Sequence, residues 1–250
     1  MAEPRAVLLI NHGSRQPHAA TFTHDAAAAL RREDPDRIVR VSFLELTPPS
    51  PAHALHQLAR AGITDVQVVP LLFSAGHHYR IDIPAAVHAA LESVPGMRVQ
   101  IAPPLLTDTH DDLIAALDAR LDEAIQDQPS SAGHRPDGLV LLAAGSSDGE
   151  ARAQVRGLAD AWGRARMVPA EAAFCDLRGG DVRAAMAKLS GRGAYRIACG
   201  SLFLATGRLL DAGRHAAANA GAGTIAGPLG LTPPLLGLLR RRCKPAVVAG

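Results

Sequence analysis

Short apolar runs alternate with stretches of helical character along the first half of the chain. The apolar runs predict four strands, at residues 6–11, 39–46, 66–73 and 97–102. The stretches between and after them predict four helices, at residues 24–32, 51–61, 82–93 and 111–125. Apolar strands are typical of sheets buried on both faces, and their alternation with helices indicates βαβ units. We therefore expect a doubly wound, mainly parallel α/β sheet.

The second half repeats this alternation after a polar segment. Residues 127–137 contain the Pro, Gly and Ser that are typical of linkers. Further strands are predicted at the apolar run that begins at Leu139 and at residues 169–175, 196–203 and 224–226. We therefore expect two domains, residues 1–127 and 137–250.

The two halves also match each other in sequence. The segment LINHGS at residues 9–14 corresponds to LLAAGS at 141–146, and SFLE at 42–45 corresponds to AFCD at 173–176. Further matches follow in the same order: Gly62 corresponds to Gly193, Gly76 to Gly207, and residues 102–105 to 226–229. Matches that keep one order indicate an internal duplication, and thus two tandem copies of one fold.

Composition excludes several classes of protein. The net charge of +2 and the aromatic content of 3% argue against a dedicated nucleic-acid-binding protein. No apolar run approaches the about 20 residues that a membrane helix needs, so we expect no membrane partner. The three cysteines form no CxxC pair, which argues against a disulfide framework and a cysteine zinc site. We expect a cytoplasmic protein.

Polar residues follow the first three predicted strands of the first half. His12 ends the first strand, Glu45 lies at the end of the second, and His77 and His78 follow the third. Ligands of open α/β sheets bind beyond the carboxyl ends of the strands, so these side chains are expected to converge. A histidine at a strand end is more often a polar residue with ordinary partners. A carboxylate within an apolar run, in contrast, is costly to bury without a function or a partner.

The second half lacks the imidazoles. Ala144, Asp176 and Leu209 stand where the first half has His12, Glu45 and His78, and nine of the eleven histidines precede Asp127. We therefore expect the first half to carry the chemistry and the second to form the opposing wall of a cleft.

Three motifs in the first half resemble a known family. They are His12-Gly13-Ser14-Arg15, Phe43-Leu44-Glu45-Leu46 before Pro49-Ser50, and the segment VPLLFSAGHH at residues 69–78 before Asp82-Ile83-Pro84. Together they resemble the class II chelatases, and within these the sirohydrochlorin chelatases of the CbiX and SirB type. The second half is similar to the degenerate repeat of the long, two-domain members. The resemblance implies two tandem chelatase-like domains.

The resemblance also implies residue roles. His12 and His78 would be metal ligands and, with Glu45, the catalytic residues, whereas His77 occupies a variable position of the motif. Either His12 or Glu45 would take the pyrrole protons, because one imidazole lone pair cannot hold a metal and a proton together. The substrate-binding residues would be Arg15, Phe73, Ser74, Ala75, Gly76, His77 and Arg80.

The resemblance implies insertion of Co²⁺ or Fe²⁺ into sirohydrochlorin, for cobalamin or sirohaem synthesis. The metal would be a substrate, and no tightly bound cofactor is expected. Fusion of two domains would replace the homodimer of single-domain members, so we expect a monomer. An alternative is a carrier protein that binds a tetrapyrrole or a metal without turnover. A nucleotide-binding protein with an anion turn at Gly13-Ser14 is less favoured, because neither GxGxxG nor GxxxxGK[ST] follows the first strand.

Overall fold

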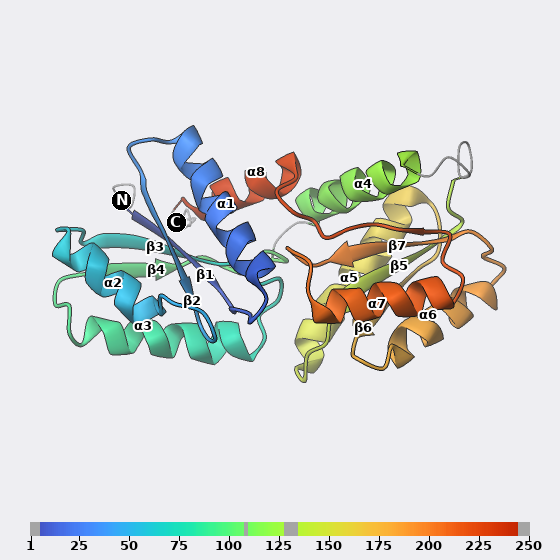
Figure 1. Ribbon diagram of the computed structural model, residues 1–250, viewed down its shortest axis with the longest axis horizontal. Coiled ribbons are helices and arrows are strands. Elements are labelled where there is room, and N and C mark those ends of the chain that lie inside the picture. Colours follow the sequence, from blue (N-terminus) through green and yellow to red (C-terminus); the bar gives the residue numbers. More distant parts are fainter. Residues whose placement is uncertain (1–5, 108–109, 128–134, 245–250) are drawn as a thin grey trace, which may run out of the picture. The chain divides into compact units, whose positions relative to one another are not determined.

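Each half of the chain forms one parallel four-stranded sheet (Figure 1). The computed structural model describes residues 6–107, 110–127 and 135–244. Its contacts divide the chain into two units, Met1–Thr107 with Leu236–Gly250, and Asp108–Leu235. The fold class predicted from the sequence, two tandem parallel α/β domains, is confirmed.

The first sheet has the order β2-β1-β3-β4. Its strands are β1 (Ala6–Asn11), β2 (Ile38–Phe43), β3 (Asp65–Pro70) and β4 (Arg98–Ile101). Every residue of β1 is buried, because β1 has a strand on each side and helices on both faces. The continuous apolar pattern of its sequence reflects this position.

Helices cover both faces of the first sheet (Figure 1). They are α1 (Pro17–Glu33), α2 (Pro51–Arg60), α3 (Ile83–Leu91) and α8 (Pro233–Arg242), and a π-helical turn, η1 (His78–Asp82), precedes α3. The side chains of alternate β1 residues lie on opposite faces of the sheet. Leu8 and Ile10 belong to the buried cluster that includes Leu55 of α2 and Val87 of α3.

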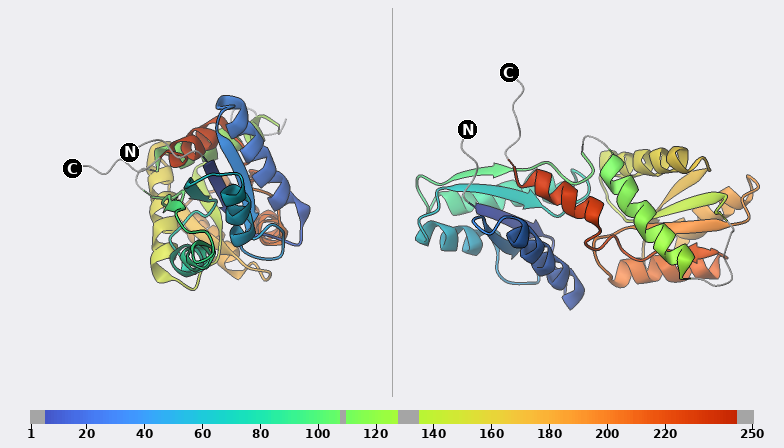
Figure 2. Two further views of the ribbon diagram at one scale, coloured as in Figure 1. Left: turned by 90° about the vertical axis from the view of Figure 1, so that its left-hand side faces the viewer. Right: turned by 90° about the horizontal axis from the view of Figure 1, so that it is seen from above.

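The second sheet repeats the first, with the order β6-β5-β7-β8. Its strands are β5 (Gly138–Ala144), β6 (Ala170–Cys175), β7 (Ile197–Leu202) and β8 (Thr224–Ile225). Its helices are α4 (Asp111–Gln126), α5 (Gly149–Arg166), α6 (Gly180–Ser190) and α7 (Arg208–Asn219). Figure 2 shows this layered arrangement of helices and strands in two further views.

Two helices belong to units other than those expected from the sequence. The expected bounds, 1–127 and 137–250, assign α4 to the first half and α8 to the second, whereas the contacts assign α4 to the second unit and most of α8 to the first. Arg242 of α8 donates to the carbonyl oxygens of Pro104 (3.2 Å) and Thr107 (2.9 Å). The amphipathic pattern of a helix predicts that one face is buried, but it does not select the sheet that buries it.

A hydrogen-bonded cluster of four side chains holds α4 against α5 in the second unit. Asp118 Oδ1 accepts hydrogen bonds from Trp162 Nε1 (2.8 Å) and Arg166 Nε (2.7 Å), and Asp122 accepts from Arg166 Nη2 (2.7 Å). The indole of Trp162 is fully buried beneath them and lies against Gly200 of β7, where a larger residue would collide with the ring. The buried indole N–H therefore has its partner, as a stable core requires.

Element ends differ from the prediction at several places. β2 and β3 end at Phe43 and Pro70, three residues before the predicted ends, so Glu45 and Phe73 lie in loops. Helix α1 begins at Pro17 rather than at residue 24, because Pro is well suited to the first turn and Phe22 and Thr23 are buried. The Ala-rich stretch used for the prediction marks only its second half.

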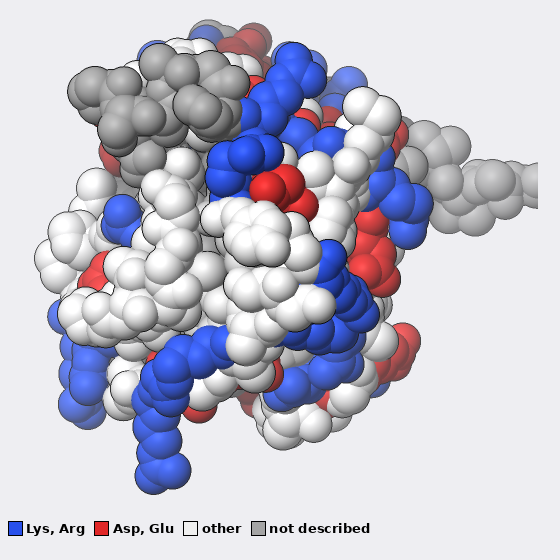
Figure 3. All heavy atoms as spheres, turned by 90° about the vertical axis from the view of Figure 1, so that its right-hand side faces the viewer, with Lys and Arg blue, Asp and Glu red and all other residues white. Residues whose placement is uncertain are grey.

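Charged side chains of both signs lie on the face of the molecule shown in Figure 3. Lys and Arg side chains lie mainly around its margins, with Asp and Glu side chains between them and uncharged side chains at the centre. Ion pairs occur in the second unit, where Glu171 contacts Lys188 (2.7 Å) and Arg192 (2.9 Å). None of the helices in the described residues is long and apolar enough to cross a membrane.

The segment after β1 runs directly against the segment after β2. Glu45 N donates to the carbonyl oxygen of His12 (2.9 Å), and Thr47 Oγ1 donates to the carbonyl oxygen of Ser14 (3.0 Å). Gly13 lies between them with a φ of +98°, and a Cβ atom there would collide with the Glu45 carbonyl oxygen. Position 13 therefore requires glycine for two reasons, the left-handed backbone conformation and the lack of space for a side chain.

We predict that Gly13→Ala lowers the free energy of unfolding more than Gly96→Ala does. Gly96 also has a positive φ, of +87°, but nothing lies within 4 Å of a Cβ atom there. Gly96→Ala should cost about 1 kcal/mol for the backbone conformation alone. Gly13→Ala should cost about 1–3 kcal/mol more, because the two segments must move apart. Urea unfolding of both variants measures the difference. An equal loss of unfolding free energy in both would contradict a role for the close contact between Gly13 and the Glu45 carbonyl group.

Candidate active site

The carboxyl ends of β1, β2 and β3 meet at one edge of the first sheet. Asn11 of β1 pairs with Phe43 of β2, and Ile10 pairs with Pro70 of β3. The segments that follow these strands therefore leave the sheet side by side. The candidate residues predicted from the sequence lie on these segments. Ligands of open parallel sheets bind at this edge.

A buried hydrogen-bond network fixes the end of β1. Asn11 Oδ1 accepts from the backbone N–H of His12 (2.7 Å), and Asn11 Nδ2 donates to Thr23 Oγ1 (2.9 Å). Thr23 in turn donates to the carbonyl oxygen of Ala19 within α1 (2.8 Å). Because buried polar groups with all partners in place are rigid, the backbone that carries His12 is held by both β1 and α1.

The structure brings His12 and His78 into direct contact. Their ring centroids are 4.3 Å apart, with an angle of 53° between the ring planes. His12 Nδ1 is buried and has no hydrogen-bond partner among the described residues. A buried polar atom without a partner is unusual and often marks a functional position. Two imidazoles this close suit a shared divalent cation, since borderline metal ions favour nitrogen ligands.

Asp82 orients the His78 imidazole. The two side chains lie on the π-helical turn η1, and His78 Nδ1 is 2.6 Å from Asp82 Oδ2. A carboxylate accepts hydrogen bonds, so Nδ1 carries the proton and Nε2 keeps its lone pair. This is the usual arrangement of a metal-binding histidine, in which a carboxylate sets the tautomer and the ring orientation. π-helical turns are also frequent at functional sites.

His77 lies away from this pair. Its side chain is 70% exposed, against 36% for His78, and its Nε2 is 3.6 Å from Asp82 Oδ1. Its ring centroid is 6.3 Å from that of His78. Of the two neighbouring histidines, only His78 therefore contacts the ring of His12 in the described structure.

Glu45 reaches the same edge but does not complete a three-residue ligand set. It is exposed, two residues beyond the end of β2, and its backbone N–H donates to the carbonyl oxygen of His12. No group of three or more His, Cys, Asp or Glu side chains within residues 6–107, 110–127 and 135–244 is arranged to hold a metal ion. The structure thus brings together two of the three residues expected to act.

The expected substrate-binding residues surround the histidine pair in sequence. Arg15, His77 and Arg80 are exposed, and the loop residues Phe73, Ser74, Ala75 and Gly76 are half-buried. The carbonyl oxygens of Leu72 and Phe73 accept from Leu105 and Leu106 (2.8 Å each), which ties the start of this loop to the segment after β4.

Sequence reasoning assigned no role to three residues that lie next to the candidate residues. Asp82 follows His78 by four positions, the spacing at which helical side chains meet, and this spacing could have revealed it. Leu46 and Ile81 are large apolar residues that are 58% and 54% exposed, beside Glu45 and Arg80 in the chain. Their exposure could not be predicted, because apolar residues are usually buried.

The second unit has no histidine at the two positions that correspond to His12 and His78. Ala144 and Leu209, which take the positions of His12 and His78, are both exposed. Asp176 Oδ1 accepts from the backbone N–H groups of Arg178 (2.8 Å) and Gly179 (2.5 Å). These backbone hydrogen bonds hold the pKa of Asp176 below its usual value. Asp176 therefore stabilises a turn, whereas the Glu45 carboxylate has no such role in the described contacts.

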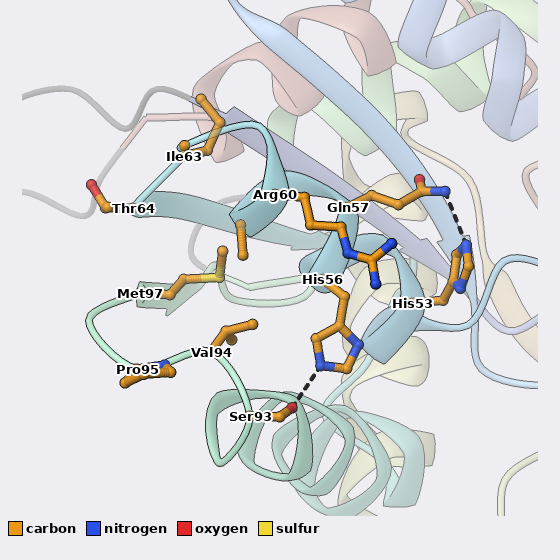
Figure 4. Close-up of a pocket in the computed structure, with 12 residues that line it drawn as sticks. His53, His56, Gln57, Arg60, Ile63, Thr64, Ser93, Val94, Pro95 and Met97 are labelled. Atoms are coloured by element: carbon orange, nitrogen blue, oxygen red, sulfur yellow. Dashed lines mark hydrogen bonds between the residues drawn. The ribbon is translucent and has the colours of Figure 1, made fainter.

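One cavity of about 590 Å³ lies away from this edge (Figure 4). Its residues belong to α2 and to the segments that enter β3 and β4, at the amino ends of these strands. Its polar side chains contact each other, with His56 Nε2 at 2.6 Å from Ser93 Oγ and Gln57 Nε2 at 2.9 Å from His53 Nε2. The histidine pair, rather than this cavity, is therefore the candidate active site.

Known proteins resemble this chain in sequence. The CbiX family model matches residues 6–124 and 138–246. A sirohydrochlorin cobaltochelatase of Methanococcoides burtonii is 33% identical over 84 residues, which are 34% of this chain and 64% of that protein. A second one, of Priestia megaterium, is 27% identical over 157 residues, 60% of this chain and 48% of that protein. The chain thus spans less than two thirds of the length of these two relatives.

A solved structure shares the fold over both units. The structure of SirB from Bacillus subtilis with Fe³⁺ superposes with a TM-score of 0.78, covering 95% of this chain and 93% of that one. The sequence identity is 22%, so this likeness concerns the fold alone.

We predict that Asp82→Ala weakens the binding of Co²⁺ by about 10–100-fold, because His78 loses the carboxylate that sets its tautomer. Glu92→Ala is the matched control, since Glu92 also lies four residues after a histidine, His88, at 3.8 Å and on an exposed surface. Isothermal titration with Co²⁺ compares the two variants with the unmodified chain. Equal affinities for both variants would contradict the role of Asp82.

Proposed function

Because the chain belongs to the CbiX family, we propose that it is a metal chelatase that inserts Co²⁺ or Fe²⁺ into sirohydrochlorin. The observation that carries the proposal is the contact between His12 and His78 at a strand-end edge, with Asp82 behind His78. The names of its relatives, sirohydrochlorin cobaltochelatase and ferrochelatase, support the same reaction and the same two metals. The product would serve cobalamin or sirohaem synthesis.

The proposed reaction exchanges one metal ion for two protons. The ion is first held by the free nitrogen atoms of His12 and His78, and it then passes to the pyrrole nitrogens of the macrocycle. Both pyrrole N–H protons must leave as the metal–nitrogen bonds form. Once the ion has left, the imidazole lone pairs are free to accept protons. The exposed Glu45 carboxylate is the second proton acceptor, and it can release protons to water.

Substrate recognition would combine charge with apolar contact. Sirohydrochlorin carries several carboxylates, and the exposed Arg15 and Arg80 flank the two histidine motifs. Guanidinium groups bind carboxylates through paired hydrogen bonds. The exposed Leu46 and Ile81, and the loop from Phe73 to His77, offer apolar and backbone contacts to a flat macrocycle.

The two-unit chain would function as a monomer in the cytoplasm. The first unit supplies the histidine pair, and the second supplies the repeated fold without imidazoles at the corresponding positions. Cys175, Cys199 and Cys243 are all buried and unpaired, as is usual in a reducing compartment.

An insertion assay tests the proposal directly. The full chain is mixed with an excess of sirohydrochlorin and Co²⁺ or Fe²⁺, and the absorbance of the macrocycle is followed with time. An enzyme gives the metallated product over many turnovers. A carrier binds the macrocycle in stoichiometric amounts, and the spectral change that marks metal insertion is then no faster than in buffer alone. That result would reject the proposal.

We predict that His12→Ala lowers the insertion rate at least about 100-fold, since the ion loses one of two imidazoles and a proton acceptor. His18→Ala is the control, because His18 is an exposed histidine at the start of α1. Circular dichroism checks that both variants are folded. Unchanged turnover by folded His12→Ala would reject the assignment of His12.

We predict that His78→Ala reduces insertion far more than His77→Ala. His78 contacts His12 and is oriented by Asp82, whereas His77 is mostly exposed. Both variants are measured in the same assay, at several Co²⁺ concentrations, so that a loss of metal affinity is separated from a loss of maximal rate. A larger loss for His77→Ala would show that the two histidines are assigned the wrong way round.

A further inference from the structure

Leu46 lies in a strained turn of the first unit, in the segment that follows β2. Its φ is +61°, a left-handed conformation that residues other than glycine rarely adopt. The backbone N–H of Thr47 donates to the carbonyl oxygen of Glu45 (2.7 Å), and this bond between residues two apart closes a γ-turn around Leu46. A γ-turn with a positive φ is the rare, strained form. The Leu46 side chain is also exposed, so neither its backbone nor its burial stabilises the fold.

Hydrogen bonds on both sides of Leu46 hold this turn against the segment that carries His12. Before it, the backbone N–H of Glu45 donates to the carbonyl oxygen of His12 (2.9 Å). After it, Thr47 Oγ1 donates to the carbonyl oxygen of Ser14 (3.0 Å). Strained conformations persist only where the surrounding structure fixes them, and they are frequent at ligand-binding sites. The turn therefore places Leu46 at the strand-end edge of the histidine pair.

The second unit builds the corresponding turn without a strained leucine. Leu177 follows Asp176 as Leu46 follows Glu45, and it is exposed as well, but its φ is not positive. The left-handed residue of that turn is Gly179, with a φ of +66°, and its N–H donates to Asp176 Oδ1. The repeated fold can thus form this turn with glycine in the left-handed position. The strain at Leu46 belongs to the unit that holds the histidine pair.

Met167 has the same kind of backbone conformation for a plain structural reason. Its φ is +57°, it ends α5, and its backbone N–H donates to the carbonyl oxygen of Arg164 (3.1 Å). Left-handed residues commonly end helices in this way. Leu46 ends no helix, so its conformation needs a different explanation.

We propose that Leu46 is a substrate-contact residue whose side chain packs against the apolar ring face of the tetrapyrrole, an inference that rests on the proposed function. An ion held by His12 and His78 can pass to the pyrrole nitrogens only if the macrocycle lies at this edge. The carboxylates of sirohydrochlorin are at its periphery, which leaves the conjugated ring for apolar contacts. A turn that is rigid before the substrate arrives lowers the entropic cost of binding. The fold thus loses stability at Leu46, and the substrate gains a fixed apolar contact.

Binding of metal-free sirohydrochlorin to the full chain, followed by the fluorescence of the macrocycle, tests the inference without turnover. Leu46→Ala and Leu46→Gly should each weaken binding about 5–10-fold, because the apolar contact is lost. The loss should be the same at low and high salt, since the contact carries no charge. Leu46→Met keeps a side chain of similar volume and should bind within about twofold of the unmodified chain. The affinity for Co²⁺ should stay unchanged in all three variants, because the histidine pair is intact.

Melting temperatures separate a substrate contact from a structural role. Leu46→Gly relieves the strain and should melt roughly 2–4 °C above the unmodified chain. Leu46→Ala should not melt higher, because alanine is also strained at a positive φ. Met167→Gly is the matched control: it relieves the same kind of strain at another exposed apolar residue, and it should leave the affinity for sirohydrochlorin unchanged. The inference thus expects Leu46→Gly to be more stable and yet to bind the substrate more weakly.

The outcomes distinguish this inference from the proposed function. If the chain inserts metal and the alanine and glycine variants of Leu46 bind sirohydrochlorin as the unmodified chain does, the inference fails and the function stands. If binding depends on Leu46 but no metal is inserted, the proposed function fails and the inference stands. A chain that binds no sirohydrochlorin overturns the inference. A lower melting temperature for Leu46→Gly also overturns it, because the leucine would then stabilise the fold itself.

Discussion

Gly13 lies against the carbonyl group of Glu45, and the candidate active site depends on this approach of two backbone segments. It is possible only without a side chain at position 13 and with a left-handed backbone conformation there. The hydrogen bonds from Glu45 to His12 and from Thr47 to Ser14 then join the two segments. His12 is thereby held at the strand-end edge from two sides, by the segment after β2 and by the Asn11–Thr23 network.

The contact between His12 and His78 gives this rigid edge its chemistry. His12 brings a buried nitrogen without a partner, and His78 brings a tautomer set by Asp82. A π-helical turn places His78 and Asp82 within hydrogen-bonding distance at the entrance to α3. Under the proposed function, the pair would hold an ion with two nitrogens and leave its other coordination positions to a macrocycle. Such partial coordination suits an ion that must be passed on, whereas a closed tetrahedral set would retain it.

The two units carry different side chains on one repeated fold. Both have the same strand order. Both also carry an aromatic residue at or next to the end of their second strand, with a carboxylate two positions further on. In the first unit this carboxylate, Glu45, is exposed, whereas in the second unit Asp176 is bound to the backbone and closes a turn. Ala144 and Leu209 take the positions of His12 and His78 in the second unit. The difference lies in the side chains at the sheet edge, since the sheets themselves are alike.

The sequence by itself determined the two parallel sheets, the duplication, the family and the edge at which the candidate residues lie. It did so because strands buried on both faces and helices with one apolar face leave clear periodic patterns, and because the motifs are local. The tertiary structure alone decided that α4 packs in the second unit and α8 on the first, since an apolar helix face fits either sheet. It also decided that His12 contacts His78 rather than His77, and that the Asp176 carboxylate is occupied by the backbone. These outcomes depend on distances between segments far apart in the chain, which no pattern of neighbouring residues contains.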